Sequence, residues 1–574
     1  MRKIFLKISK TVLLLSVIFT IISCNKGIKD TINNPEIPSR IVSGMGATLP
    51  YVEYEAENGS TNGSIYGPNR DYLSWEAEAS GRKYVRLDST GKYVQWTASA
   101  SANTMVVRYS IPDGTSGTLS LYVNGVYKQK VYLDSKYAWV YGNFPWTNYS
   151  ESGNGHKIFD EVNFFTSGDI PAGATVKLQK NSDDTLPYYL IDLIDLEKVS
   201  AFNAPSNSLS ITSYGATAND GTDDRTAIIN CINAAKSQGK TVWIPAGEFN
   251  INNETIPVDN VTIGGAGMWY SRLVGARSGF KLNGNNCRFY NFSIMGTTST
   301  RDDNSDVDNA FSGSAGTGSV IEGIWVEHKK CGVWINGGTS GLTITKSRFR
   351  NLMADAVNFC AGASNCTVSN SHIRFSGDDA LATWSPSGSS GCNGNTFDSN
   401  TIQLPWLASG IAVYGGANHK VINNLICDIV TGGAGICIST DFTPVPLTGT
   451  ITVEGNTLYR CGSNEQYLGY APGAIWVVAD DSDISSATIN ITSNNINEST
   501  TSGICLQGSK FIYNTNISDT AINNSTGYGI LIHSNAKGNT KFTNVTVSNA
   551  TKGGIANNAG SNFEIWKNSG NIGW

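Results

Sequence analysis

At 574 residues the chain is longer than an ordinary single domain, and its 40% hydrophobic content is enough for packed cores rather than disorder. Charged residues make up only 15% and glycine is abundant at 61 residues, which favours short strands with polar turns over helices. The net charge of −5 excludes a basic surface for nucleic acid or anionic lipid, and it favours a neutral polysaccharide over an anionic one.

The N-terminus has the pattern of a bacterial lipoprotein signal. Basic residues precede an apolar run over 11–22, which is short for a membrane span and is followed by Ser23 and Cys24. Residues 21–24 resemble a lipobox, in which the cysteine becomes the lipidated first residue, although a plain signal peptide with an incidental cysteine has the same outline. We therefore expect a signal peptide over 1–23, lipidation at Cys24, a tether over 24–46 and a place in the bacterial cell envelope, lipid-anchored or secreted.

The ten cysteines that follow Cys24 contain no C-x-x-C pair, so the sequence signals no zinc or redox site. Cys437 and Cys505 each stand in an apolar strand pattern, where a cysteine behaves as a small buried hydrophobe. Disulfides can form outside the cytoplasm, but the sequence does not require them.

Residues 47–200 predict a β-sandwich, because stretches such as 106–111 and 119–123 alternate in the manner of strands between Gly/Asp/Ser turns. The domain resembles carbohydrate-binding modules of families 6 and 35, in which an E-x-E pair near the start and an aspartate near the end hold a structural calcium. The resemblance makes Glu55, Glu57 and Asp192 candidate calcium ligands; the alternative is that these acids lie on an exposed strand face, since three acids do not supply the six to eight ligands that calcium needs. Sugar stacking and core packing both remain open for Trp75, Trp96, Trp139 and Trp146.

A second domain over 205–574 begins with a short amphipathic helix. We expect Thr222 or Asp223 as its N-cap and an end near Gly239. This opening resembles the N-terminal cap of pectate-lyase-like right-handed parallel β-helices.

Repeats follow the helix. A small residue followed by alternating hydrophobes recurs at Gly332, Ala356 and Ala380, at intervals of 24 residues, and continues at wider intervals to the C-terminus. A fixed period with no helical pattern in between predicts one coil of a parallel β-helix per repeat, because a propeller blade would need about 40–50 residues.

The repeat places two aspartates in register. Asp355 precedes Ala356 and Asp379 precedes Ala380, so their carboxyls should be neighbours on strands about 4.8 Å apart, with Asp378 beside them. Carboxyls this close cannot all ionise independently, so at least one pKa should rise, and one carboxyl can then donate a proton while another activates water. Structural turn aspartates and a calcium site are the alternatives.

The whole mature chain resembles glycoside hydrolase family 87, which contains α-1,3-glucanases (mutanases) and mycodextranases. The segments that carry the resemblance are 108–113 (RYSIPD), 324–328 (IWVEH), 354–359 (ADAVNF), 376–382 (SGDDALA), 402–405 (IQLP) and 411–416 (IAVYGG). It implies an inverting hydrolase of α-1,3-glucan, endo-acting, that uses Asp355, Asp378 and Asp379 without a catalytic cofactor. Asp378 is the implied acid, and the other two aspartates are implied to hold the water.

Residues near the trio are candidates for substrate binding, namely Asn358, Trp384, Trp406 and Tyr414. We expect a monomer that binds α-glucan, no nucleic acid, and a membrane only through the lipid anchor. The alternatives are a non-catalytic glycan-binding surface protein, a polygalacturonase, whose Gly-His-Gly and Arg-Ile-Lys elements have no counterpart here, and a uronate lyase with Arg374 or Lys346 as its base.

Overall fold

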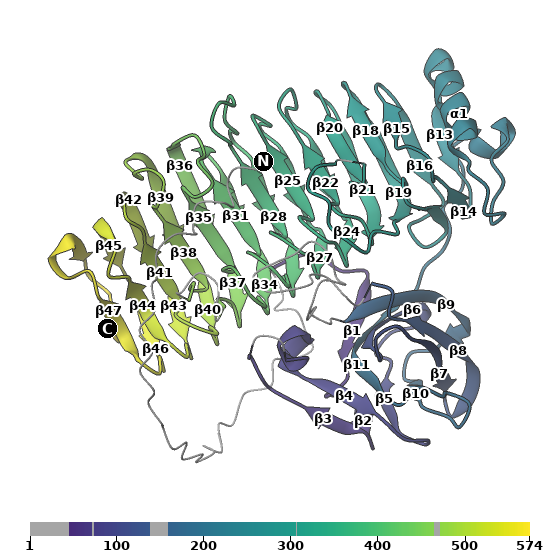
Figure 1. Ribbon diagram of the computed structural model, residues 1–574, viewed down its shortest axis with the longest axis horizontal. Coiled ribbons are helices and arrows are strands. Elements are labelled where there is room, and N and C mark those ends of the chain that lie inside the picture. Colours follow the sequence, from purple (N-terminus) through teal and green to yellow (C-terminus); the bar gives the residue numbers. More distant parts are fainter. Residues whose placement is uncertain (1–44, 72–73, 138–158, 306, 464–470) are drawn as a thin grey trace, which may run out of the picture.

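The computed structural model describes residues 45–71, 74–137, 159–305, 307–463 and 471–574; the predictions for Cys24, Trp139 and Trp146 lie outside these ranges. A β-sandwich lies against the side of a long parallel β-helix (Figure 1). The predicted all-β fold is confirmed. Among the described residues, no helix is long and apolar enough to cross a bilayer.

The sandwich consists of two antiparallel sheets around one apolar core. The sheet that faces the β-helix contains β1 (Tyr51–Glu55), β3 (Ser64–Tyr66), β4 (Tyr84–Leu87), β6 (Ala102–Ser110), β9 (Asp160–Ile170) and β11 (Tyr189–Glu197). The other sheet contains β2 (Ser60–Thr61), β5 (Tyr93–Thr97), β7 (Ser116–Val123), β8 (Val126–Asp134) and β10 (Thr175–Gln179). Trp96 lies in the core between the sheets, so it is a packing residue rather than an exposed sugar platform.

One α-helix of the described chain, α1 (Arg225–Gln238), covers the first coil of the β-helix with its buried face. The helix begins after Asp224, so the prediction of Thr222 or Asp223 as N-cap was wrong. Asp224 is held there because its carboxylate accepts the backbone N–H groups of Thr217 and Asn250. The predicted end is confirmed, with Gly239 in the left-handed conformation that closes a helix.

The repeat motif found in the sequence forms a 12-stranded parallel sheet. Its strands are β15 (Ile256–Val258), β18 (Phe280–Asn283), β20 (Phe311–Ser314), β22 (Val333–Ile335), β25 (Val357–Cys360), β28 (Leu381–Trp384), β31 (Ile411–Tyr414), β35 (Ile436–Ser439), β38 (Ile475–Val478), β41 (Ile504–Gln507), β44 (Tyr528–Ile532) and β47 (Gly553–Asn557). Val357, Leu381, Ile411 and Ile436 pair in register across consecutive coils and are fully buried. The same inward position in every coil therefore builds one continuous core.

The remaining faces of the coils form one 25-stranded sheet. Its strands are β12 (Ser208–Ser210), β13 (Thr241–Ile244), β14 (Gly247–Asn250), β16 (Thr262–Gly265), β17 (Ser271–Val274), β19 (Arg288–Met295), β21 (Val320–Glu327), β23 (Thr343–Thr345), β24 (Arg348–Arg350), β26 (Thr367–Ser369), β27 (His372–Arg374), β29 (Thr396–Asp398), β30 (Thr401–Gln403), β32 (Gly416–Ala417), β33 (Lys420–Ile422), β34 (Leu425–Cys427), β36 (Leu447–Glu454), β37 (Thr457–Tyr459), β39 (Ser486–Thr492), β40 (Asn495–Asn497), β42 (Phe511–Ser518), β43 (Ala521–Asn523), β45 (Lys537–Thr543), β46 (Thr546–Ser548) and β48 (Phe563–Lys567). A ladder of buried asparagines fixes one bend of the coil, with each backbone N–H donating to the next side-chain oxygen from Asn400 through Asn424 and Asn456 to Asn494.

The ten described cysteines are all free, and nine of them are buried. Cys437 on β35 and Cys505 on β41 are among these nine, as their apolar strand patterns predict.

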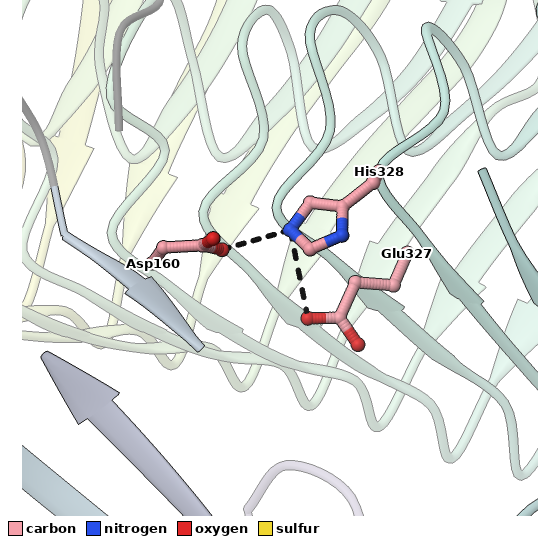
Figure 2. A group of neighbouring side chains, drawn as sticks. All are labelled: Asp160, Glu327 and His328. Atoms are coloured by element: carbon pink, nitrogen blue, oxygen red, sulfur yellow. Dashed lines mark hydrogen bonds and ion pairs between the residues drawn. The ribbon is translucent and has the colours of Figure 1, made fainter. Parts of the chain in front are cut away.

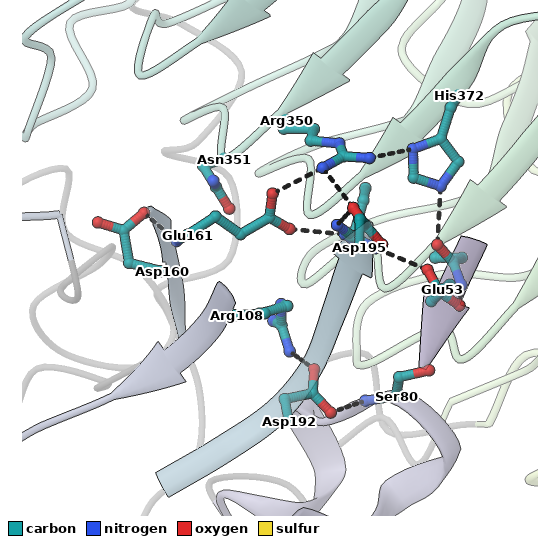
Figure 3. A network of polar contacts seen from close by, with 12 residues as sticks. Glu53, Ser80, Arg108, Asp160, Glu161, Asp192, Asp195, Arg350, Asn351 and His372 are labelled. Carbon is teal, nitrogen blue, oxygen red and sulfur yellow. Dashed lines mark hydrogen bonds and ion pairs between the residues drawn. The ribbon is translucent and has the colours of Figure 1, made fainter. Parts of the chain in front are cut away.

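Two arginines of the β-helix hold the sandwich through buried ion pairs (Figure 3). Arg374 on β27 contacts Glu161 at 2.6 Å and Asp195 at 2.7 Å, and Arg350 on β24 contacts the same two acids at 3.1 and 2.9 Å. Burial opposes ionisation of Asp195 and Glu161, but the two guanidinium groups outweigh it and lower the pKa of both carboxyls. The sandwich is thus fixed to the coils by buried ion pairs in which Glu161 and Asp195 each contact both arginines.

His372 stands beside this pair of arginines and stays neutral. Burial, followed by the positive charge of Arg350, lowers the pKa of His372 well below its usual range. Nε2 of the ring lies 2.7 Å from Oε1 of Gln403, and Arg350 reaches Nδ1 at 3.4 Å. These contacts fit a neutral ring that donates to Gln403 and accepts from Arg350.

Candidate active site

The structure brings Asp355, Asp378 and Asp379 together at the edge of the 12-stranded sheet. Val357 pairs with Leu381, so the residues that precede β25 and β28 lie side by side, as the period predicts. One carboxylate oxygen from each of the three acids lies within 4.8 Å of the others. We call these three residues the aspartate trio.

Two members of the trio are buried and hydrogen-bonded. Asp355 accepts the side-chain amide of Asn358 at 3.2 Å, and Asp379 accepts the backbone N–H of Ser409 at 2.8 Å and the hydroxyl of Tyr414. Burial, followed by the negative charge of Asp378, raises the pKa of Asp355 well above its usual range and that of Asp379 to about 8. The trio therefore retains a proton near neutral pH.

Asp378 is the accessible member, with 28% of its side chain exposed. Its carboxylate lies 2.8 Å from the guanidinium of Arg301 and also accepts the backbone N–H of Asp379 at 3.0 Å. No sequence pattern linked Arg301 to the trio, because this residue belongs to a distant segment between β19 and β20. That segment is held near the trio by Lys330, which donates to the carbonyl of Asp302 at 2.9 Å.

Three of the four predicted substrate-binding residues lie on the outer side of the sheet or beside an acid. Trp384 is half-buried and packs edge to face against Trp334, which belongs to an earlier coil, with the ring centroids 6.4 Å apart. Tyr414 is half-buried and pairs in register with Trp384, while Asn358 is buried against Asp355.

Trp406 has a different place from the one predicted. It is 4% exposed and packs in a small apolar cluster beneath the trio, so its ring is not available for sugar stacking. A Cβ added at Gly377 would lie 2.4 Å from this ring. Trp406 thus supports the backbone that carries Asp378 and Asp379. The sequence could not distinguish the two roles, because both require a tryptophan close to the acids.

Neither base suggested for a lyase lies at the trio. Arg374 is fully buried and paired with Glu161, Asp195 and Glu53 at the domain interface. Lys346 is 62% exposed and pairs with Glu322 on another face of the coil. Because both side chains are paired with acids away from the trio, neither serves as the base that the lyase hypothesis required.

The predicted calcium ligands lie where the sandwich meets the β-helix. Asp192 is engaged by Arg108 and by the backbone N–H of Ser80, so it is not free to bind a cation. Glu55 and Glu57 each retain a buried carboxylate oxygen without a hydrogen-bond partner. Burial is the largest cause that raises the pKa of both glutamates, that of Glu57 to about 8. Two of the three acids therefore offer oxygens to a cation, and the third does not.

A second cluster of possible metal ligands within the described chain joins Asp160, Glu327 and His328 (Figure 2). Nε2 of His328 lies 2.8 Å from Asp160 and 4.0 Å from Glu327, and Tyr137 stacks on the imidazole at 3.8 Å. Burial opposes protonation, but Asp160 outweighs it and raises the pKa of His328 to about 9. The protonated His328 forms an ion pair with Asp160 that joins the β-helix to the sandwich.

Comparisons with known proteins match both parts of the chain. Residues 48–199 match the family model described as α-1,3-glucanase catalytic domain D1, and residues 225–574 match catalytic domain D2. A search of curated proteins gave no match.

Solved structures match over nearly the whole chain. The catalytic unit of a thermostable GH87 α-1,3-glucanase from Streptomyces thermodiastaticus strain HF3-3 is 34% identical, with a TM-score of 0.84 over 92% of this chain and 97% of that one. The Agl-KA catalytic domain is 31% identical, with a TM-score of 0.84 over 92% and 99%. A GH87 α-1,3-glucanase catalytic domain in complex with nigerose is 28% identical, with a TM-score of 0.80 over 92% and 99%.

Proposed function

Since the chain belongs to the GH87 family of α-1,3-glucanases, and is therefore a glycoside hydrolase, we propose that it cleaves internal α-1,3 linkages of an extracellular glucan with inversion at the anomeric carbon. The observation that carries the proposal is the aspartate trio, in which three carboxyls share one solvent-facing corner. The related catalytic domains bound to nigerose and to tetrasaccharides support an α-glucan as the substrate.

In the proposed mechanism Asp378 protonates the leaving glycosidic oxygen. It is the accessible member of the trio, so a sugar can approach it without rearrangement of the core. Asp355 and Asp379 hold the attacking water, because their positions are fixed by Asn358 and by Ser409 with Tyr414. Asp379 passes the proton that burial keeps on it to Asp378 and then, as a carboxylate, accepts the proton that the attacking water loses, so the trio ends the reaction with as many protons as it began with.

The stereochemical outcome depends on how the water is placed. Inverting enzymes usually separate acid and base by roughly 6.5–9.5 Å, and retaining ones by about 5–5.5 Å. The 4.8 Å that encloses one oxygen of each acid is a distance between single atoms and not between carboxyl groups, so it selects neither outcome. Inversion is therefore supported by the family resemblance and not by carboxylate spacing.

A panel of insoluble and soluble α-glucans tests both linkage and stereochemistry. We expect release of reducing sugar from α-1,3-glucan, intermediate-sized products early in the reaction, and a β-anomeric product by proton NMR. An α-anomeric first product would refute inversion, and glucose as the sole early product would refute endo action. Binding without sugar release would favour a surface glycan-binding protein, and ultraviolet absorbance from unsaturated products would favour a lyase.

We also propose that Cys24 carries lipid and anchors the enzyme to the bacterial envelope. We further propose that the enzyme is a monomer. Metabolic labelling with a fatty-acid analogue should mark the wild-type protein and not the Cys24→Ser variant. Equal labelling of both would refute the anchor, and a dimer in gel filtration would refute the monomer.

Calcium at the sandwich is proposed only for Glu55 and Glu57, whose buried oxygens lack partners. The cation would relieve the crowding of negative charge that opposes ionisation of Glu55. Chelation should lower the melting temperature of the protein, and the Glu55→Gln/Glu57→Gln variant should lose this response. A chelator without effect on the wild type would refute the site.

A further inference from the structure

Phe442 follows β35 in a backbone conformation that is rare for its residue type. Its φ is +66° and that of Thr443 is +47°, both in the left-handed region that residues with a Cβ avoid. The phenylalanine side chain is nevertheless 49% exposed, so burial of the ring does not account for the strained backbone.

The surrounding backbone holds this segment in place. The N–H of Thr443 donates to Oδ2 of Asp481 at 2.7 Å, and its carbonyl accepts the N–H of Ser387 at 3.0 Å. Gly415 lets the segment approach closely, because a Cβ there would lie 2.2 Å from the carbonyl oxygen of Val445. Strained residues that persist in such a scaffold are often functional.

The ring of Phe442 contacts Tyr414, which in turn contacts the aspartate trio. It meets Tyr414 edge to face at 5.2 Å and 83°, and the hydroxyl of Tyr414 bonds Asp379. Tyr414 pairs in register with Trp384 of the preceding coil. Phe442 therefore extends an aromatic run that starts beside the catalytic acids.

We propose that Phe442 is a sugar-binding residue of this active site, which stacks against a glucosyl unit next to the one cleaved at the trio. An exposed, rigidly held aromatic ring offers apolar surface to the C–H face of a pyranose at little cost in side-chain entropy. This proposal rests on the proposed glucanase function and assigns part of its substrate specificity. The competing explanation is that the ring only packs on Tyr414.

Two substitutions separate these explanations. Phe442→Ala removes the ring and keeps a Cβ at positive φ, whereas Phe442→Gly removes the ring and relieves the strain. Both should raise KM for an α-1,3-linked tetrasaccharide about 2- to 10-fold with kcat close to that of the wild type. The glycine variant should melt no lower than the wild type, and Phe442→Trp should restore KM.

Phe511→Ala is the matched control, because Phe511 is also an exposed phenylalanine, at 40%, but lies on β42 in the other sheet. It should leave KM unchanged. Unchanged KM in Phe442→Ala would overturn the inference, as would lower melting temperatures in both Phe442 variants. If the wild type itself fails to cleave α-1,3-glucan, the proposed function fails instead.

Discussion

The domain interface and the aspartate trio both bury carboxyls, but the buried acids of the interface are paired with arginines. At the interface Glu161 and Asp195 each contact both Arg350 and Arg374, with closest approaches of 2.6–3.1 Å. At the trio Arg301 pairs with the exposed Asp378, and neither buried acid has an ion-pair partner among the described residues. The same residue type therefore serves opposite purposes in the two places.

The difference appears in the direction of the pKa shifts. The arginines lower the pKa of Asp195, whereas burial and like charge raise the pKa of Asp379 to about 8. Buried carboxyls that are paired with arginine hold the two domains together, and buried carboxyls without such a partner keep a proton available for chemistry. Four substitutions test this division.

The largest effect is expected for Asp378→Asn, which removes the proposed acid but keeps its shape. Activity on α-1,3-glucan should fall about 10²- to 10⁴-fold, the usual contribution of a general acid. The melting temperature should stay near that of the wild type, because the side chain is partly exposed. Asp398→Asn on β29, outside the trio, is the control and should be fully active; equal activity of both variants would contradict the assignment.

Arg374→Met should act on stability instead. It removes one cation from the buried Glu161 and Asp195 and from the partly exposed Glu53, and a broken buried pair costs roughly 3–5 kcal/mol. Denaturant unfolding measures the loss. Lys346→Ala removes an exposed pair and should change the free energy of unfolding by less than about 1 kcal/mol. Similar losses in the two variants would show that the interface does not depend on buried pairing.

Tyr414→Phe removes the hydroxyl that bonds Asp379 and leaves the ring in place. Because Asp379 keeps its proton near neutral pH, this is a hydrogen bond between neutral groups, which is worth about 0.5–1.5 kcal/mol, so kcat/KM should fall about 2- to 10-fold. Tyr132→Phe, at a tyrosine that is 75% exposed on the sandwich, should be indistinguishable from the wild type. A fully active Tyr414→Phe variant would mean that Ser409 alone positions Asp379.

The smallest effect concerns the dependence of stability on pH. Because the folded state holds the proton of Asp379 up to a pKa of about 8, the unfolded chain loses it first, and this group favours folding less as pH rises toward 8. Asp195 contributes to stability in the opposite direction. Its pKa is lower in the folded state, so it stabilises the fold above its ordinary pKa, and this stabilisation is lost in acid. Asp379→Asn should therefore flatten a plot of melting temperature against pH between about pH 4 and pH 8, and leave unchanged the loss of stability in stronger acid that Asp195 causes. Parallel curves for the variant and the wild type would contradict the raised pKa.

The sequence anticipated the fold where local pattern and period were enough. The repeats that begin at Gly332, Ala356 and Ala380 predicted the strands of the coils. The predicted helix end at Gly239 is confirmed by the left-handed conformation of this residue. It missed the N-cap at Asp224, because the bonds that hold this residue come from Asn250, beyond the helix. It also treated the sandwich as a separate binding module, although the sandwich contributes the acids that pair with Arg350 and Arg374 and matches a catalytic-domain model.

At the site, the repeat predicts which acids meet, because coils of fixed length place Asp355 beside Asp379 whatever the surrounding loops do. The environment of these acids depends on segments that lie far away in the chain. Arg301, Ser409 and Tyr414 reach the trio from other segments, and Trp406 turns beneath it instead of toward a sugar. The physical reason is that register is set locally by hydrogen bonding between coils, whereas burial and charge balance depend on every segment that packs around a residue.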